Sequence, residues 1–176
     1  MNNMKRIFVF ASLLLAMIIC LKPAFGQGGE KSGKDDVMSF LAKYQDVKGF
    51  ESQTFVKGEG LGIVKAQMGK KMGKTFMRGV TIISMVEYSE VAPQVCDSIH
   101  ADYGKYFSKF LDVEVPDSSK KDISYSRTFL MLEEDKSAIT DFITIIEDKE
   151  VKVFLYMGGE IKSDDLIKAA EEEEED

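Results

Sequence analysis

The chain has 176 residues, with 23 basic and 30 acidic side chains, and 44% of its residues are hydrophobic. The resulting formal charge of −7 disfavours nucleic acids and anionic lipid surfaces as partners. The length corresponds to one domain with an ordinary hydrophobic core.

The N-terminus has the features of a secretory signal peptide. Lys5 and Arg6 precede the uncharged run IFVFASLLLAMIICL, which is shorter than the roughly 20 residues that a membrane-spanning helix needs. The sequence AFG before Gln27 places small side chains where a signal peptidase cuts. We therefore predict a signal peptide over residues 1–26, export to the periplasm or the extracellular space, and no stable transmembrane span after processing.

Lipid anchoring at Cys20 is the alternative, which Ile19 disfavours because a lipoprotein peptidase requires a small residue before its cysteine. Cleavage after Gly26 removes three basic residues and no acid, leaving 20 basic and 30 acidic residues and a charge of −10. It also leaves Cys96 as the single thiol, so no internal disulfide can form and packing must stabilise the fold.

The first half of the exported chain predicts alternating helices and strands. Residues 27–34, QGGEKSGK, have the composition of a flexible leader. Apolar side chains at i, i+3, i+4 and i+7 predict a helix over 35–45, and β-branched or aromatic residues predict strands over 50–56 and 76–88. Residues 58–73 are predicted to be helical in their middle, with glycines weakening both ends.

Residues 90–110 carry the clearest helical pattern. Their apolar side chains fall within an arc of about 120° when successive residues are placed 100° apart. This arc contains Ala92, Val95, Cys96, Ile99, Tyr103, Tyr106, Phe107 and Phe110. The segment is therefore predicted to be an amphipathic helix that packs against a sheet.

The second half predicts a three-stranded meander. After a loop over 111–122, strand-like runs occupy 123–133, 138–146 and 151–157, joined by the short polar turns EDKS and EDKE. Gly158–Gly159 is predicted to end the last strand, and Ser163 to cap a C-terminal helix. The acidic residues 171–176 are predicted to form a disordered tail.

These elements predict an α+β fold within a single domain over residues 35–170. Its two layers are a mostly antiparallel sheet of about five strands and amphipathic helices packed on one face. The C-terminal meander is followed by a helix.

The C-terminal half, YSRTFLMLEEDKSAITDFITIIEDKEVKVFLYMGGEIKSDDLIK, together with DSIHADYGKYFSKFLDVEV and DDVMSFLAKYQDVKGFESQTFV, resembles a family of small exported proteins of the Bacteroidetes that carry a domain of unknown function. The resemblance covers residues 35–170 and rests on hydrophobic pattern. It implies an envelope or secreted protein without established catalytic activity, and it carries over no functional residues.

Two glycine-rich stretches match nucleotide-binding motifs in part. GKKMGKT ends like a P-loop, but Met68 stands where that motif needs its first glycine. GEGLG lacks the third glycine of a dinucleotide fingerprint, since position 63 is isoleucine, and is predicted to be a turn that needs positive φ angles. We therefore predict no cofactor.

One basic patch stands out on this acidic chain, and it is the predicted site for an anionic ligand or an acidic partner; a solvated loop is the alternative. The patch comprises Lys65, Lys70, Lys71, Lys74 and Arg78.

Cys96 and His100 have the i, i+4 spacing of two metal ligands or a thiolate–imidazole pair. The helical arc buries Cys96 and leaves His100 at the border with water, and two ligands alone hold a metal poorly. We therefore predict no metal site and no catalytic residues. Glu147 is predicted to be a solvated acid in a turn, and Asp141 to mark the solvent face or an edge of its strand.

The sequence thus predicts a non-catalytic binding or sensing module of the cell envelope or secreted space, with an unknown macromolecular partner. The alternative is a hydrolase whose site uses carboxylates or His100 in a cleft that sequence does not reveal.

Overall fold

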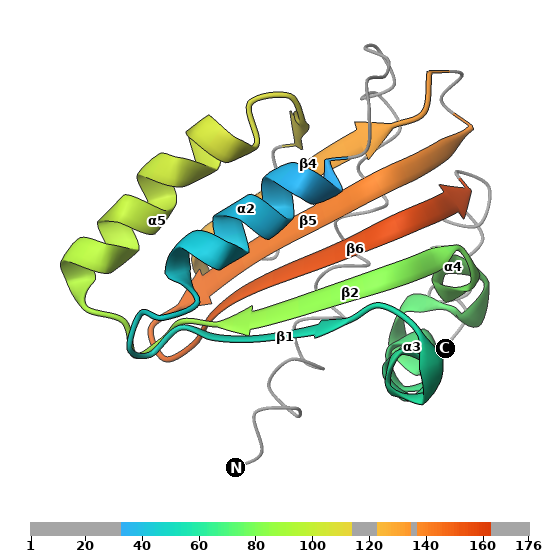
Figure 1. Ribbon diagram of the computed structural model, residues 1–176, viewed down its shortest axis with the longest axis horizontal. Helices are drawn as coiled ribbons and strands as arrows, with labels where there is room; N and C mark the ends of the chain where they lie inside the picture. The colour runs from blue at the N-terminus through green and yellow to red at the C-terminus, as the bar shows by residue number, and fades with distance from the viewer. Residues whose placement is uncertain (1–32, 114–122, 135–136, 163–176) are drawn as a thin grey trace.

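A computed structural model describes residues 33–113, 123–134 and 137–162 of the chain. The fold is α+β, as predicted, and its sheet has six antiparallel strands in the order β1-β2-β6-β5-β4-β3 (Figure 1). In chain order, the elements are α2 (Lys34–Tyr44), β1 (Glu51–Phe55), α3 (Gly58–Met72), α4 (Lys74–Arg78), β2 (Val80–Glu87), α5 (Pro93–Tyr106), β3 (Leu111–Val113), β4 (Ile123–Leu132), β5 (Ala138–Asp148) and β6 (Lys152–Lys162).

Local signals explain where the two amphipathic helices α2 and α5 begin. Asp35 and Asp36 lie in the first turn of α2, where the helix dipole favours negative charge. Pro93 opens α5, a position that needs no backbone N–H donor. Both predicted helices are confirmed, as is the meander, because β4, β5 and β6 pair in sequence.

Four local predictions were wrong. The stretch GEGLG (58–62), predicted to be a turn with positive φ angles, is the start of α3, and of its three glycines only Gly58 has a positive φ. Residues 74–78, expected to lead into and begin a strand, form the short helix α4, and residues 111–113, expected in a loop, pair with β4 as the edge strand β3. Strand β6 also does not stop at Gly158–Gly159 but continues to Lys162.

The Gly158–Gly159 pair lies where β2 and β6 approach closely. A register shift occurs there between Val80 and Ile82, and Gly159 adopts a φ of 152°. A Cβ atom built on Gly79 would lie 1.8 Å from the carbonyl oxygen of Glu160. The glycines therefore permit a close approach of the paired strands β2 and β6 instead of ending β6.

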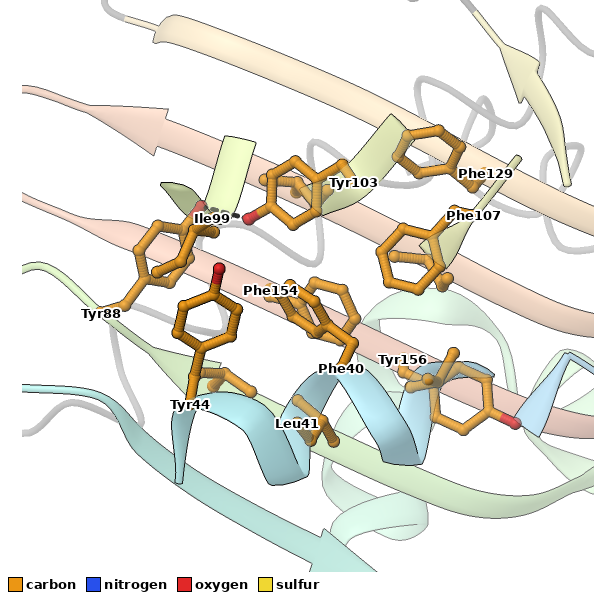
Figure 2. Packing of buried hydrophobic residues seen from close by; sticks show 14 of the residues in the cluster. Phe40, Leu41, Tyr44, Tyr88, Ile99, Tyr103, Phe107, Phe129, Phe154 and Tyr156 are labelled. Carbon is orange, nitrogen blue, oxygen red and sulfur yellow. Dashed lines mark hydrogen bonds between the residues drawn. The ribbon is translucent and has the colours of Figure 1, made fainter. Parts of the chain in front are cut away.

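Helices α2 and α5 cover one face of the sheet with an aromatic cluster (Figures 1 and 2). Phe40 is fully buried at its centre, and the neighbouring ring centroids lie 5.3–5.8 Å from its own. These rings belong to Tyr44, Tyr103, Tyr106, Phe107 and Phe154. The two helices are also joined by Asp102, which accepts hydrogen bonds from Tyr44 (2.7 Å) and Lys43.

Helices α3 and α4 pack against the opposite face, at one end of the sheet. Their buried residues Leu61, Phe76 and Met77 share a cluster with side chains of β2, β5 and β6. Successive strand residues point to opposite faces, so Ile83 and Ile82 belong to different clusters. Both faces of the central strands are thus apolar, and helices pack on both faces instead of on one face as predicted.

Replacing Phe40 with leucine is expected to lower the free energy of unfolding by about 2 kcal/mol, through lost volume and lost aromatic pairs. Denaturant unfolding monitored by circular dichroism measures this value. Phe55→Leu is the matched control, because Phe55 is only partly buried on the edge strand β1. Equal losses in the two variants would contradict the central role of Phe40.

The predicted signal peptide (1–26), the C-terminal helix and the acidic tail (171–176) lie outside the described residues, as does the predicted leader up to residue 32. Within the described part of the chain, no helix has both the length and the apolar character that crossing a bilayer requires.

Candidate functional site

A pocket of about 630 Å³ lies between the start of α3, the junction of α4 and β2, and the Gly158–Gly159 pair of β6. Its size falls within the range of small-molecule sites. The walls combine backbone and apolar side chains with four cations, and the four cationic residues are Lys34, Lys57, Lys65 and Arg78.

The charge of this pocket contrasts with that of the whole chain. Among the described residues that line it there is no aspartate or glutamate, although acids outnumber basic residues in the chain, 30 to 23. A concave surface lined by one sign of charge concentrates the opposite ion. The pocket is therefore suited to an anionic group.

Lys65 forms a fixed part of the wall. Its Nζ donates to the carbonyl oxygens of Val80 (2.7 Å) and Arg78 (3.2 Å) and so links α3 to the start of β2. Burial lowers the pKa of Lys65 from its ordinary value. Because Lys65 is engaged with the backbone, the exposed Arg78 and Lys57 are better placed to contact a ligand.

The first turn of α3 borders the pocket. Lys57 is the N-cap residue in an extended conformation, and within the described chain no side chain caps this helix. Gly58 follows with a φ of 80° and lines the pocket with Leu61. The free N–H groups of a first turn carry partial positive charge, which Glu59 in the same turn offsets in part.

Asp141 lies beside the pocket, where Thr140 and Tyr156 form part of the lining. Its carboxylate accepts hydrogen bonds from the Gly33 N–H (2.8 Å), the Tyr156 hydroxyl (2.7 Å) and the Thr140 hydroxyl (2.9 Å). In Figure 2 the Tyr156 hydroxyl points out of the aromatic cluster toward the start of α2. Burial, together with the charge of Asp141, raises the pKa of Tyr156 well above its ordinary value.

The sequence-based interpretation of Asp141 was therefore wrong. The residue is 0% exposed on an inner strand, instead of lying on a solvent face or an edge. The reason is long-range: the carboxylate receives the N–H of Gly33, 108 residues away in the sequence, at the start of α2.

The structure divides the predicted basic patch. Lys65 and Arg78 line the pocket, whereas Lys70 and Lys74 are exposed and are not among its lining residues. The side chain of Lys71 is outside the described part of the structure. Sequence reasoning missed two further cations, Lys34 and Lys57. The position of Lys57 directly before a helix that begins with glycine was a local signal for a cation at this site. No comparable local signal marked Lys34.

A second cluster lies toward the far end of β5. Cys96 is buried and His100 is partly exposed, as their helical positions predicted, but Glu147 joins them from β5. The prediction that Glu147 is a solvated acid in a turn was wrong, since this residue is buried within the strand. Glu147 thus adds to Cys96 and His100 the carboxylate that sequence spacing alone did not reveal.

Comparisons with family models, curated proteins and solved structures find no match to this chain. The resemblance to exported Bacteroidetes proteins therefore stays a prediction.

Proposed function

We propose that this protein is a non-catalytic binding module whose pocket holds an anionic group, in the exported compartment that its N-terminal sequence predicts. The observation that carries the proposal is the set of four cations without a described acid in one pocket of an acidic chain. Export and the absence of catalysis are parts of the same proposal.

The lining also favours a particular class of anion. Beside the cations, Val56 lines the pocket with 43% of its surface exposed, and Leu61, Val80 and Ile82 contribute further apolar walls. A ligand with a carboxylate or phosphate head on an apolar body satisfies both kinds of wall. The described lining contains no histidine, cysteine or carboxylate to act as a nucleophile or general base.

The hydrolase alternative gains no support at His100. Cys96 Sγ and Glu147 Oε1 both approach the same ring nitrogen, Nε2. A nucleophile–histidine–acid relay uses the two different ring nitrogens. The hydrolase hypothesis therefore stays a prediction from the sequence.

Isothermal titration calorimetry with octyl phosphate and octanoate tests the binding proposal, with octan-1-ol as the neutral match. We expect both anions to bind and octanol to bind at least tenfold more weakly. Added salt should weaken anion binding, since exposed charges are screened. Equal affinity for octanol would contradict an anion site.

Substitutions within the basic patch locate the site. Arg78→Gln and Lys57→Gln should each weaken anion binding by about tenfold, the loss of one charge-assisted contact. Lys70→Gln and Lys74→Gln are matched controls, because they remove the same charge outside the pocket, and should change affinity by less than about twofold. Equal losses in all four variants would indicate a general charge effect and contradict the pocket.

A further inference from the structure

Three metal-ligating side chains converge on one point beside α5. Cys96 and His100 lie on neighbouring turns of this helix, and Glu147 reaches them from β5. His100 Nε2 lies 3.7 Å from Cys96 Sγ and 2.6 Å from Glu147 Oε1. One ligand atom of each residue lies within 4.8 Å of the others.

One of these separations already matches a tetrahedral zinc centre. Zn–S and Zn–N bonds of about 2.3 and 2.05 Å place the sulfur and nitrogen about 3.6 Å apart, close to the distance between Cys96 and His100. The same geometry places nitrogen and oxygen about 3.4 Å apart. The His100–Glu147 hydrogen bond therefore has to lengthen as a metal ion takes the place of its proton.

Neighbouring side chains hold the ligands in orientation. The Tyr88 hydroxyl donates to Glu147 Oε1 (2.6 Å), and the Tyr103 hydroxyl donates to that of Tyr88 (3.1 Å), a bond drawn in Figure 2. The His100 ring stacks on Tyr125 with centroids 4.5 Å apart. Such outer contacts fix the ligand atoms and strengthen metal binding.

A cation already lies at this cluster. Lys152 Nζ is 3.0 Å from Cys96 Sγ, and this hydrogen bond raises the pKa of Lys152. An ammonium on a four-carbon stem can swing toward solvent and leave its place to a metal ion. Access exists at the surface, since the His100 side chain is 30% exposed while that of Glu147 is 5% exposed.

We propose that Cys96, His100 and Glu147 form a three-ligand site for a divalent transition-metal ion of the zinc class. The mixed sulfur, nitrogen and oxygen ligands select zinc-like ions over magnesium or calcium, which prefer oxygen alone. The site is separate from the anion pocket. Thr140 at the pocket and Glu147 are seven residues apart on β5, about 24 Å at the rise of an antiparallel strand. Either proposal can therefore fail without the other.

Zinc binding to the full chain, stripped of metal with a chelator, is measured by competition with a chromogenic chelator. We expect one tight zinc equivalent, and affinity at least tenfold lower in each of Cys96→Ser, His100→Gln and Glu147→Gln. The exposed Glu90→Gln is the matched acid control and should change affinity by less than about twofold. Zinc binding that is no tighter in the wild type than in Cys96→Ser would overturn the site.

Two further measurements separate ligation from a structural role. Cobalt(II) bound to the wild type should show a thiolate-to-cobalt charge-transfer band that Cys96→Ser lacks. Lys152→Met should bind zinc several-fold more tightly, because no ammonium competes for the sulfur. Near-ultraviolet circular dichroism checks folding, and Glu147→Gln retains an acceptor for Tyr88. Absence of the cobalt band in folded wild type, or weaker zinc binding in Lys152→Met, would contradict metal ligation.

Discussion

Replacing Asp141 with alanine is expected to lower the free energy of unfolding by about 4 kcal/mol. The carboxylate is fully buried and accepts from Gly33, Thr140 and Tyr156. Without it, the Gly33 N–H and the Tyr156 hydroxyl lose their shared acceptor in a buried place, and each unsatisfied donor costs about 1–3 kcal/mol. Since natural domains are stable by about 5–15 kcal/mol, this single change removes a large share of the total.

Urea unfolding followed by circular dichroism measures this loss. Asp141→Asn keeps the shape and a carbonyl acceptor, so we expect about half the effect. Asp112→Ala removes a carboxylate from the exposed ion pair with Arg127 and should cost less than about 1 kcal/mol. A loss for Asp141→Ala no larger than that for Asp112→Ala would contradict the role of Asp141 as a buried acceptor.

Alkaline solution is expected to lower the free energy of unfolding progressively above pH 10. Burial raises the pKa of Tyr88, Tyr103 and Tyr156 well above the ordinary 10.0, and that of Tyr44 and Tyr125 to about 12. In the unfolded chain these hydroxyls ionise near pH 10, whereas in the native protein they stay protonated. The stability from this difference is complete below pH 10 and decreases as the pH rises toward the native pKa values.

The expected slope is steep because several tyrosines act together. Above pH 10, each buried tyrosine lowers the free energy of unfolding by about 1.4 kcal/mol per pH unit. Tyr88, Tyr103 and Tyr156 together therefore lower it by about 4 kcal/mol per pH unit. Free energies of unfolding at pH 9, 10 and 11 measure the slope, and tyrosinate absorbance reports ionisation. Tyr103→Phe should reduce the slope by one tyrosine's share. A free energy that stays constant from pH 9 to 11 would contradict the burial of these hydroxyls.

Local sequence patterns were sufficient for most of the secondary structure. The apolar arc of residues 90–110 and the short polar turns of the meander each depend on neighbours within a few positions, and both were predicted correctly. The same patterns failed at Gly158–Gly159, because a glycine pair has the same local appearance whether it ends a strand or permits the close approach of a paired strand.

The candidate sites were predictable only in fragments. Lys65 and Arg78 were identified because basic residues cluster between positions 65 and 78. Cys96 and His100 were identified by their i, i+4 spacing on a helix. Their partners Lys34 and Glu147 could not be found in this way. Lys34 lies 31 residues before Lys65, and Glu147 lies 47 residues after His100, so no short-range pattern predicts that either pair shares a site.

The chain alone therefore defined its α+β class, its amphipathic helices, its acidic charge and its predicted export signal, since these follow from composition and short-range periodicity. Folding decided which distant residues meet. Strand β6 pairs with both β2 and β5, and this arrangement brings four cations around one pocket and a strand carboxylate beside a helical thiol and imidazole. Such contacts arise from the burial of both faces of one shared sheet, which no local stretch of sequence specifies.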